Sequence, residues 1–331
     1  MSISAAFFTF SGPVQAQVCE TDKPIVFGDL DWDSVVFHNE VARFILEKGY
    51  GCQTDAIPGS TIPLYAGAVR GNISVIMEVW ENISPKVWKD ALQAGKVREV
   101  GVNFSDAVQG WYVPRYLVEG DDAPAKDLKS VSDLPKYKTL FQDQEEPEKG
   151  RFYNCVPGWG CEISNTKKFY GYGLDKDFIN YRPGTAAAMN ASIESAFRRK
   201  QPIVFYYWGP SWIYGKYIKD MVPLQEPAYD ETVWKQMEET KKPEEVKQAT
   251  AYPLGTVKVG VNSAFAKRAP KLTEFLARYR TSNDITSEAL VYMQENRGSA
   301  KKAALNFLKT REDVWRPWVS PDVAARVKSA L

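Results

Sequence analysis

The chain contains a single histidine, His38, among its 331 residues. It also has no Gly-x-Ser-x-Gly sequence, no Gly-rich phosphate-binding loop and no His-Glu-x-x-His pair. These absences leave no recognisable residue set for nucleophilic, acid–base or metal-assisted catalysis. We therefore expect a protein that is not an enzyme and that has no cofactor and no metal. We interpret His38 as a hydrogen-bonded structural residue of a helix rather than as a base.

A calcium loop is also missing, although three aspartates alternate at Asp29, Asp31 and Asp33. Such a loop needs a glycine after them and a distant glutamate, and neither stands at the required position. We interpret Asp33, together with Ser34, as the cap of the helix that follows. Asp31 is expected to supply a charge at the rim of a pocket.

The chain has no excess of charge of either sign. Its 42 Lys and Arg balance 41 Asp and Glu, which leaves a net charge of +1, and the two signs are mixed along the sequence. A nucleic-acid partner would require a basic stripe, so we do not expect one.

Long apolar runs are absent as well, since none reaches the ~18 residues of a membrane helix. Residues 1–17 are uncharged and apolar and end near Ala16, which predicts a signal-like segment, with a disordered tail as the alternative. Cys19 does not follow a lipoprotein pattern. We expect a soluble, exported, periplasmic protein that is a monomer.

The chain has only four cysteines, an even number. Cys155 and Cys161 are close enough to close a short loop, and Cys19 and Cys52 both lie beside predicted strands. In an oxidising compartment both pairs could form disulfides. A zinc site is the rival interpretation, but the spacings do not match one and the single histidine is distant in sequence.

Strands and helices alternate from the start of the chain, which predicts an α/β fold with mostly parallel sheets. A chain of this length is expected to form two lobes. We predict lobe 1 from residues 18–112 plus 226–331 and lobe 2 from residues 113–225. The expected strands are 24–28, 51–57, 73–80, 108–116, 203–208 and 257–261. The expected helices are 33–48, 61–69, 162–169 and 186–199, with three more after residue 261.

Ten tryptophans are present, and five stand where a cleft is expected. Ligands bind at the carboxyl ends of strands in open α/β sheets, and these five lie at predicted strand ends or on a glycine-flanked loop. Each ring face attracts a quaternary ammonium by ~0.5–2 kcal/mol. The five are Trp32, Trp80, Trp111, Trp159 and Trp208. The other five, expected to be packing residues, are Trp88, Trp212, Trp234, Trp315 and Trp318.

The loop around Trp159 opens a predicted helix. The backbone amides of Gly160 and Cys161 would therefore lie at a helix N-terminus and could take an anion. A ring face for a cation beside amide donors for a carboxylate predicts a site for a zwitterion.

At these residues the chain resembles the substrate-binding proteins of ABC importers for glycine betaine and related quaternary amines. The resemblance extends from Lys23 to the C-terminus and is most specific in the loop Asn154–Glu162, in the stretch 204–210 and at Val79-Trp80. It implies a type II periplasmic binding protein fold, with two lobes that close on the ligand about two crossover segments. It also implies membrane permease subunits of an ABC importer as partners.

The resemblance assigns site residues by position. In the betaine-binding members three tryptophans form a box, and these match Trp80, Trp159 and Trp208, while the loop amides match Gly160 and Cys161. In the choline-binding branch the matching rings are those of Trp32, Trp80, Trp111 and Trp208.

One departure concerns the polar end of the ligand. The betaine binders have a histidine four residues after the position of Trp80, whereas this chain has Ser84, and Glu81 stands beside Trp80. We expect Ser84 and Glu81 to contact the polar end. Glycine betaine, trimethylamine N-oxide, choline and dimethylsulfoniopropionate all stay open as ligands. Two other classes are an enzyme acting on methylated amines and a receptor for amino acids or peptides.

Overall fold

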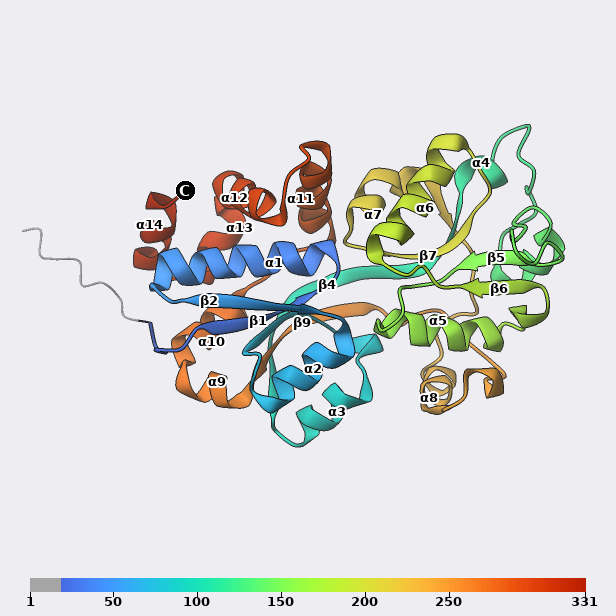
Figure 1. Cartoon of the computed structure of the whole chain (residues 1–331). Coiled ribbons are helices and arrows are strands. Elements are labelled where there is room, and N and C mark those ends of the chain that lie inside the picture. Colours follow the sequence, from blue (N-terminus) through green and yellow to red (C-terminus); the bar gives the residue numbers. More distant parts are fainter. Residues whose placement is uncertain (1–18) are drawn as a thin grey trace, which may run out of the picture.

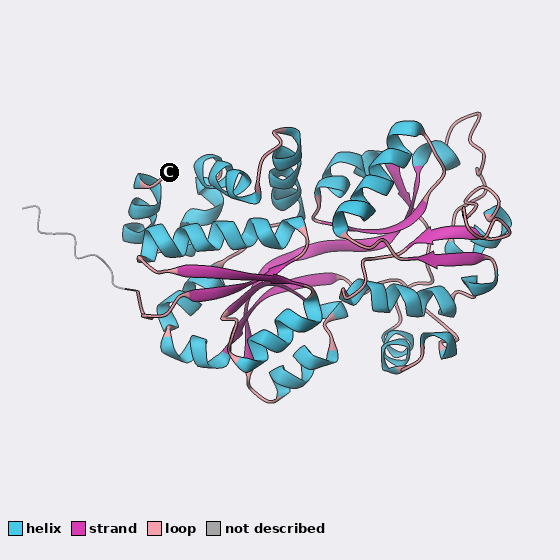
Figure 2. Ribbon diagram, in the orientation of Figure 1, coloured by secondary structure: helices cyan, strands magenta, loops and turns pink. Residues whose placement is uncertain are grey.

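The computed structural model describes residues 19–331, and the predicted signal-like segment at residues 1–17 lies outside the described residues. The chain forms two α/β bodies that share one long strand, β4 (Val97–Pro114) (Figures 1 and 2). Strand order across the sheet is β2-β1-β3-β9-β4-β7-β5-β6, with β8 also paired to β4. We call the body around β1, β2, β3 and β9 lobe 1, and the body around β5 to β8 lobe 2.

Lobe 1 contains a sheet covered by helices on both faces (Figure 1). Strand β1 pairs in parallel with β2 and β3, whereas β9 runs antiparallel to β3 and β4. Its strands are β1 (Ile25–Leu30), β2 (Thr54–Gly59), β3 (Val75–Trp80) and β9 (Gly255–Asn262). Its helices are α1 (Asp33–Phe44), α2 (Thr61–Arg70), α3 (Lys86–Gln93), α9 (Ser263–Arg268), α10 (Pro270–Arg278), α11 (Asn283–Glu295), α12 (Ala300–Thr310), α13 (Glu312–Trp315) and α14 (Pro321–Ser329).

Lobe 2 repeats the same arrangement on a smaller scale, with α6 and α7 on one face of its sheet and α5 and α8 on the other (Figure 1). Strand β5 pairs in parallel with β6 and β7, and β7 runs antiparallel to β4. Its strands are β5 (Gly150–Tyr153), β6 (Phe178–Tyr181), β7 (Val204–Gly209) and β8 (Met221–Pro223). Its helices are α4 (Arg115–Val118), α5 (Gly160–Gly171), α6 (Ala186–Arg199), α7 (Trp212–Tyr217) and α8 (Glu231–Glu239).

Strands β3 and β7 are buried along their whole length, because each is paired on both sides and covered by helices. Their sequences accordingly read as continuous apolar runs rather than as alternating ones. Glu78 is the one charged residue in β3, and it is completely buried. Both runs end in a tryptophan, Trp80 and Trp208, at the edge where the two lobes meet.

The expected strands and the four helices expected before residue 200 are present, with shifted ends. After residue 261 the chain forms six helices, α9 to α14, where three were expected. The helix cap at Asp33 and Ser34 was predicted wrongly: the N-cap is Trp32, which makes no side-chain capping bond. Asp33 is the first helical residue, and burial raises the pKa of its carboxyl. The short strands β5 and β6 and helix α8 were not predicted from the sequence.

Strand β4 carries the first crossing between the lobes. Its residues up to Ala107 pair with β9, and those from Val108 to Tyr112 pair with β7. The chain returns to lobe 1 at β9. Helix α8 packs against α5 of lobe 2.

Candidate functional site

A cavity lies between the lobes, where the strand ends of β1, β3 and β7 converge. Its volume is about 40 Å³. By the same measure, one water molecule requires about 10–15 Å³. The cavity is thus small and suits a compact ligand. Lobe 1 lines it with Trp32, Thr61, Tyr65, Trp80, Ile83 and Pro85, and lobe 2 with Trp159, Gly160, Cys161, Tyr206 and Trp208.

Four of the five tryptophans expected at the site line this cavity: Trp32, Trp80, Trp159 and Trp208. The ring of Trp159 meets Trp32 at a centroid distance of 5.2 Å and Trp208 at 5.4 Å, with interplanar angles of 69° and 84°. In edge-to-face contacts of this kind the planes of neighbouring indoles are steeply inclined to each other. The rings therefore form adjoining walls rather than a flat stack.

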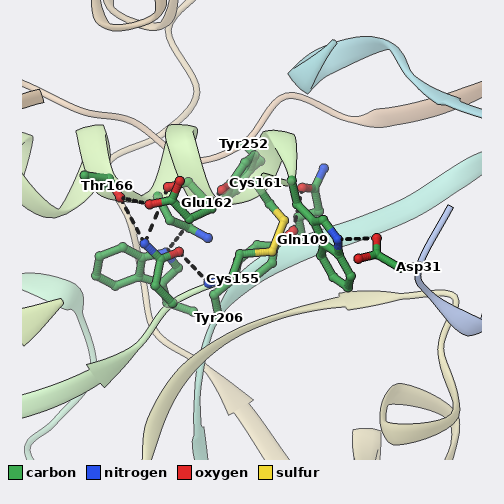
Figure 3. The surroundings of a disulfide bond; sticks show 12 residues. Asp31, Gln109, Cys155, Cys161, Glu162, Thr166, Tyr206 and Tyr252 are labelled. Carbon is green, nitrogen blue, oxygen red and sulfur yellow. Dashed lines mark hydrogen bonds between the residues drawn. A yellow bond between two sulfur atoms is a disulfide. The ribbon is translucent and has the colours of Figure 1, made fainter. Parts of the chain in front are cut away.

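Two carboxylates of lobe 1, the buried Glu78 and the exposed Asp31, hold three of the four indoles by their N–H groups. One oxygen of Glu78 accepts hydrogen bonds from Trp32 at 2.8 Å and from Trp80 at 3.0 Å. Asp31 of lobe 1 accepts a hydrogen bond of 2.6 Å from Trp159 of lobe 2 (Figure 3). Each indole thus has its polar edge satisfied by the protein, which leaves its apolar face for a ligand.

The loop that carries Trp159 is closed by a disulfide between Cys155 and Cys161 (Figure 3). The side chain of Asn154 bonds the backbone N–H of Cys155 and donates to Thr166 of α5. The loop is therefore fixed to its own helix before any ligand binds. A second disulfide joins Cys19 and Cys52, so both pairs expected from the sequence are present.

Two glycines of this loop lie against lobe 1. Gly158 has a φ of +90°, and a Cβ on it would lie 3.3 Å from the hydroxyl oxygen of Ser60. A Cβ on Gly160 would lie 2.5 Å from the backbone oxygen of Ile83. The lobes approach this closely only because these side chains are absent.

Gly160 and Cys161 are also the first residues of helix α5. The N-cap residue, Trp159, makes no side-chain capping bond. The first amides of α5 therefore lie at the cavity without a capping side chain, next to the positive end of the helix dipole. Among the described residues that line the cavity, none has a cationic side chain.

Comparison with known protein families supplies the observation that decides the assignment. Residues 23–310 match the family described as the substrate binding domain of ABC-type glycine betaine transport system. The chain belongs to this family. Its members are substrate-binding components of transport systems, and the resemblance seen in the sequence is confirmed.

Curated relatives span most of the chain at low identity. The glycine betaine/proline betaine-binding periplasmic protein of Escherichia coli K12 is 24% identical over 269 residues, which cover 79% of this chain and 78% of that one. The trimethylamine N-oxide-binding protein of Pelagibacter ubique is 20% identical over 304 residues, covering 92% and 93%. No helix within residues 19–331 has the length and apolar character needed to cross a membrane.

Solved structures share the fold. Lactococcal OpuAC in a closed-liganded conformation with glycine betaine aligns with a TM-score of 0.69 at 18% identity, covering 90% of this chain and all of that one. An ABC-transporter choline binding protein in complex with choline aligns with a TM-score of 0.71 at 18% identity, covering 93% and 97%. The two-lobed periplasmic binding protein fold expected for this family is confirmed.

Three residues expected at the site do not reach the cavity. Trp111 is completely buried in lobe 2, where it stacks on Phe152 at 3.8 Å and donates to Asn165. Strand β4 carries it past the junction of the lobes into that core. Ser84 donates to the backbone oxygen of Trp80 at 2.8 Å. The side chain of Glu81 is half exposed and pairs with Lys258.

Sequence reasoning missed Glu78 behind the cavity and five residues that line it: Thr61, Tyr65, Ile83, Pro85 and Tyr206. Thr61 is the first residue of α2, directly after β2, and its place at a strand end was a signal that could have identified it. Tyr65 donates its hydroxyl to the backbone oxygen of Glu78 at 3.1 Å. Glu78 offered one signal, a charge inside a buried strand.

Burial shifts the pKa values of the ionisable groups behind the rings. It raises the pKa of Glu78 to about 7 and lowers that of His38 to about 3. Nδ1 of His38 lies 2.9 Å from the hydroxyl of Tyr279, and its Nε2 lies 3.7 Å from Glu78. His38 is therefore the hydrogen-bonded structural residue that the sequence indicated.

Proposed function

We propose that this protein is a periplasmic receptor that captures a small onium osmolyte of the glycine betaine type and delivers it to an ABC permease. The observation that carries this proposal is the box of four indoles around a cavity whose lining residues include no cationic side chain. Such a box favours a permanent cation that carries methyl groups instead of N–H donors. A primary ammonium is disfavoured, because its donors would stay unpaired against hydrocarbon.

In this proposal the rings of Trp32, Trp80, Trp159 and Trp208 surround the cationic head. The amides of Gly160 and Cys161 take the polar end, with the hydroxyl of Thr61 as a further donor. A carboxylate there gains from the uncapped end of α5. The names of the relatives support the same class of ligand, since they bind glycine betaine, proline betaine or trimethylamine N-oxide.

The head group defines the ligand class, and the polar end distinguishes its members. Glycine betaine has a carboxylate for the α5 amides, whereas trimethylamine N-oxide offers one compact oxygen. Choline would place a hydroxyl there, and dimethylsulfoniopropionate would place a sulfonium in the box. The absence of a histidine at Ser84 removes one partner that a carboxylate has in the betaine binders.

A calorimetric panel tests the proposal. Glycine betaine, choline, trimethylamine N-oxide, dimethylsulfoniopropionate and glycine are titrated into the purified protein. At least one methylated onium should bind with micromolar affinity or better, while glycine should not bind. The proposal would be contradicted if glycine bound and none of the methylated ligands did. Chemical conversion of an onium ligand during incubation would favour an enzyme that acts on methylated amines.

A further inference from the structure

The carboxyl group of Glu78 lies directly behind two walls of the cavity. One of its oxygens accepts the N–H groups of both Trp32 and Trp80. The residue has no exposed surface. An ionised carboxylate in such a place is unfavourable unless a positive charge or several hydrogen bonds stabilise it. Because burying an ionisable group here is unfavourable, its presence indicates a role that an apolar core residue could not fill.

The groups around Glu78 include none that neutralises its charge. His38 of α1 faces its second oxygen at 3.7 Å, and burial lowers the pKa of that imidazole to about 3, so the ring is neutral. Tyr65 of α2 and Tyr279 after α10 are the other titratable groups that interact with Glu78, and burial raises the pKa of each. Within residues 19–331, no Lys or Arg forms an ion pair with Glu78.

We propose that Glu78 is a positioning residue of the onium site, which fixes Trp32 and Trp80 and supplies the negative charge that the bound cation neutralises. This inference rests on the proposed function. Hydrogen bonds from both indoles to one carboxylate oxygen set the orientation of the two rings relative to each other. An indole N–H that donates to a charged acceptor also makes its ring face more negative, which strengthens the attraction to a cation.

Binding and protonation of Glu78 are then coupled. A cation in the box favours the ionised carboxylate, so its pKa falls on binding and a proton is released. Because burial raises the pKa of the free protein's Glu78 to about 7, affinity should be highest above that pH. It should fall as the pH decreases through that value. A fall of one unit in the pKa of Glu78 on binding corresponds to about tenfold in affinity.

Glu78→Gln and Glu99→Gln provide a matched pair of variants. Glutamine keeps an oxygen that can accept from the two indoles but cannot carry a charge. Glu99 accepts the N–H of Trp88 at 3.0 Å, so it is another carboxylate bound to an indole, and neither residue of that pair lines the cavity. Folding of both variants is checked by near-ultraviolet circular dichroism before binding is measured.

The experiment titrates tetramethylammonium and choline, whose cationic heads do not titrate, from about pH 5.5 to about pH 8.5. Wild type and Glu99→Gln should lose about tenfold in affinity toward the acid end. They should also release protons on binding, seen as a dependence of the enthalpy on the buffer. Glu78→Gln should bind about tenfold more weakly than wild type at pH 8.5, with no pH dependence and no proton release.

Three outcomes are distinguishable. Binding by wild type that does not change with pH would overturn the inference and leave the proposed function standing. A pH dependence that persists in Glu78→Gln would assign it to another group, such as His38, and would also overturn the inference. Failure of wild type to bind any onium at any pH would instead contradict the proposed function.

Discussion

Replacing Gly160 by alanine tests whether ligand binding requires the close approach of the two lobes. The new Cβ would lie 2.5 Å from the backbone oxygen of Ile83 in lobe 1. That is nearly 1 Å short of an ordinary contact of about 3.4 Å, and a backbone atom cannot swing away as a side chain does. Within lobe 2 the change is mild, because Gly160 is a helical residue with a negative φ, and alanine is the better helix former.

The expected magnitude follows from the size of the overlap. Overpacking of this kind costs about 1–3 kcal/mol, which corresponds to roughly 5-fold to 150-fold in Kd. The cost applies only to the closed state, so the melting temperature of the ligand-free protein should not fall. Calorimetry with the best ligand of the panel measures the affinity, and differential scanning calorimetry measures the stability.

Gly184→Ala is the matched control. A Cβ on Gly184 would have no atom within 4 Å, and the residue does not have a positive φ. This variant should therefore bind the ligand as wild type does. If Gly160→Ala bound the ligand with the affinity of wild type, the reasoning would be refuted. The ligand would then bind without the close approach of residue 160 to Ile83. A melting temperature lowered by several degrees would also refute it, because the cost would then lie within lobe 2.

The remaining predictions concern the box, its buried charge and its loop. Trp208→Ala should weaken onium binding by about 2–4 kcal/mol, at least about thirtyfold in Kd, because the ligand loses one ring face. Trp234 of α8 is similarly buried, and Trp234→Ala should leave the affinity measured by calorimetry unchanged. Equal losses of affinity in the two variants would contradict this prediction. Burial raises the pKa of Glu78 from 4.5 to about 7. Below about pH 4.5 the carboxyl is neutral in both the folded and the unfolded chain, and the folded state keeps its full stability. As the pH rises through about 7, the buried carboxyl ionises and that part of the free energy of unfolding is lost. Glu78→Gln should therefore be more stable than wild type at pH 8, by as much as about 3 kcal/mol in chemical denaturation, and this gain should shrink toward pH 5; a gain independent of pH would argue against titration. Replacing Cys155 and Cys161 together by serine should weaken binding several-fold, because the Trp159 loop must then be ordered on binding, and an unchanged Kd would show that the loop is rigid without the bond.

Much of the fold was predictable because local patterns control it. Strand β3 and helix α6 follow from runs and spacings of apolar residues, and the loop disulfide follows from two cysteines six residues apart. Helix α8 was missed because its surroundings are charged and interrupted by proline. Its assignment to lobe 2 depends on contacts with α5, which no local pattern encodes.

The candidate site divides in the same way. Trp32, Trp80 and Trp208 were identifiable as strand-end residues, and Trp159 by its flanking glycines. Trp111 looked equivalent because it also stands in an apolar strand. Periodicity indicates that such a ring is buried, but only the course of β4 decides whether it faces the cavity or the core of lobe 2.

The sequence by itself determined which rings are available and how the loop of Trp159 begins its helix, because these features depend on neighbouring residues along the chain. The tertiary structure decided which acid holds Trp32, Trp80 and Trp159. Glu78 and Trp32 are 46 positions apart, and Asp31 and Trp159 are 128 positions apart. Hydrogen bonds over such separations depend on strand register and on the contact between the lobes, which only the folded chain establishes.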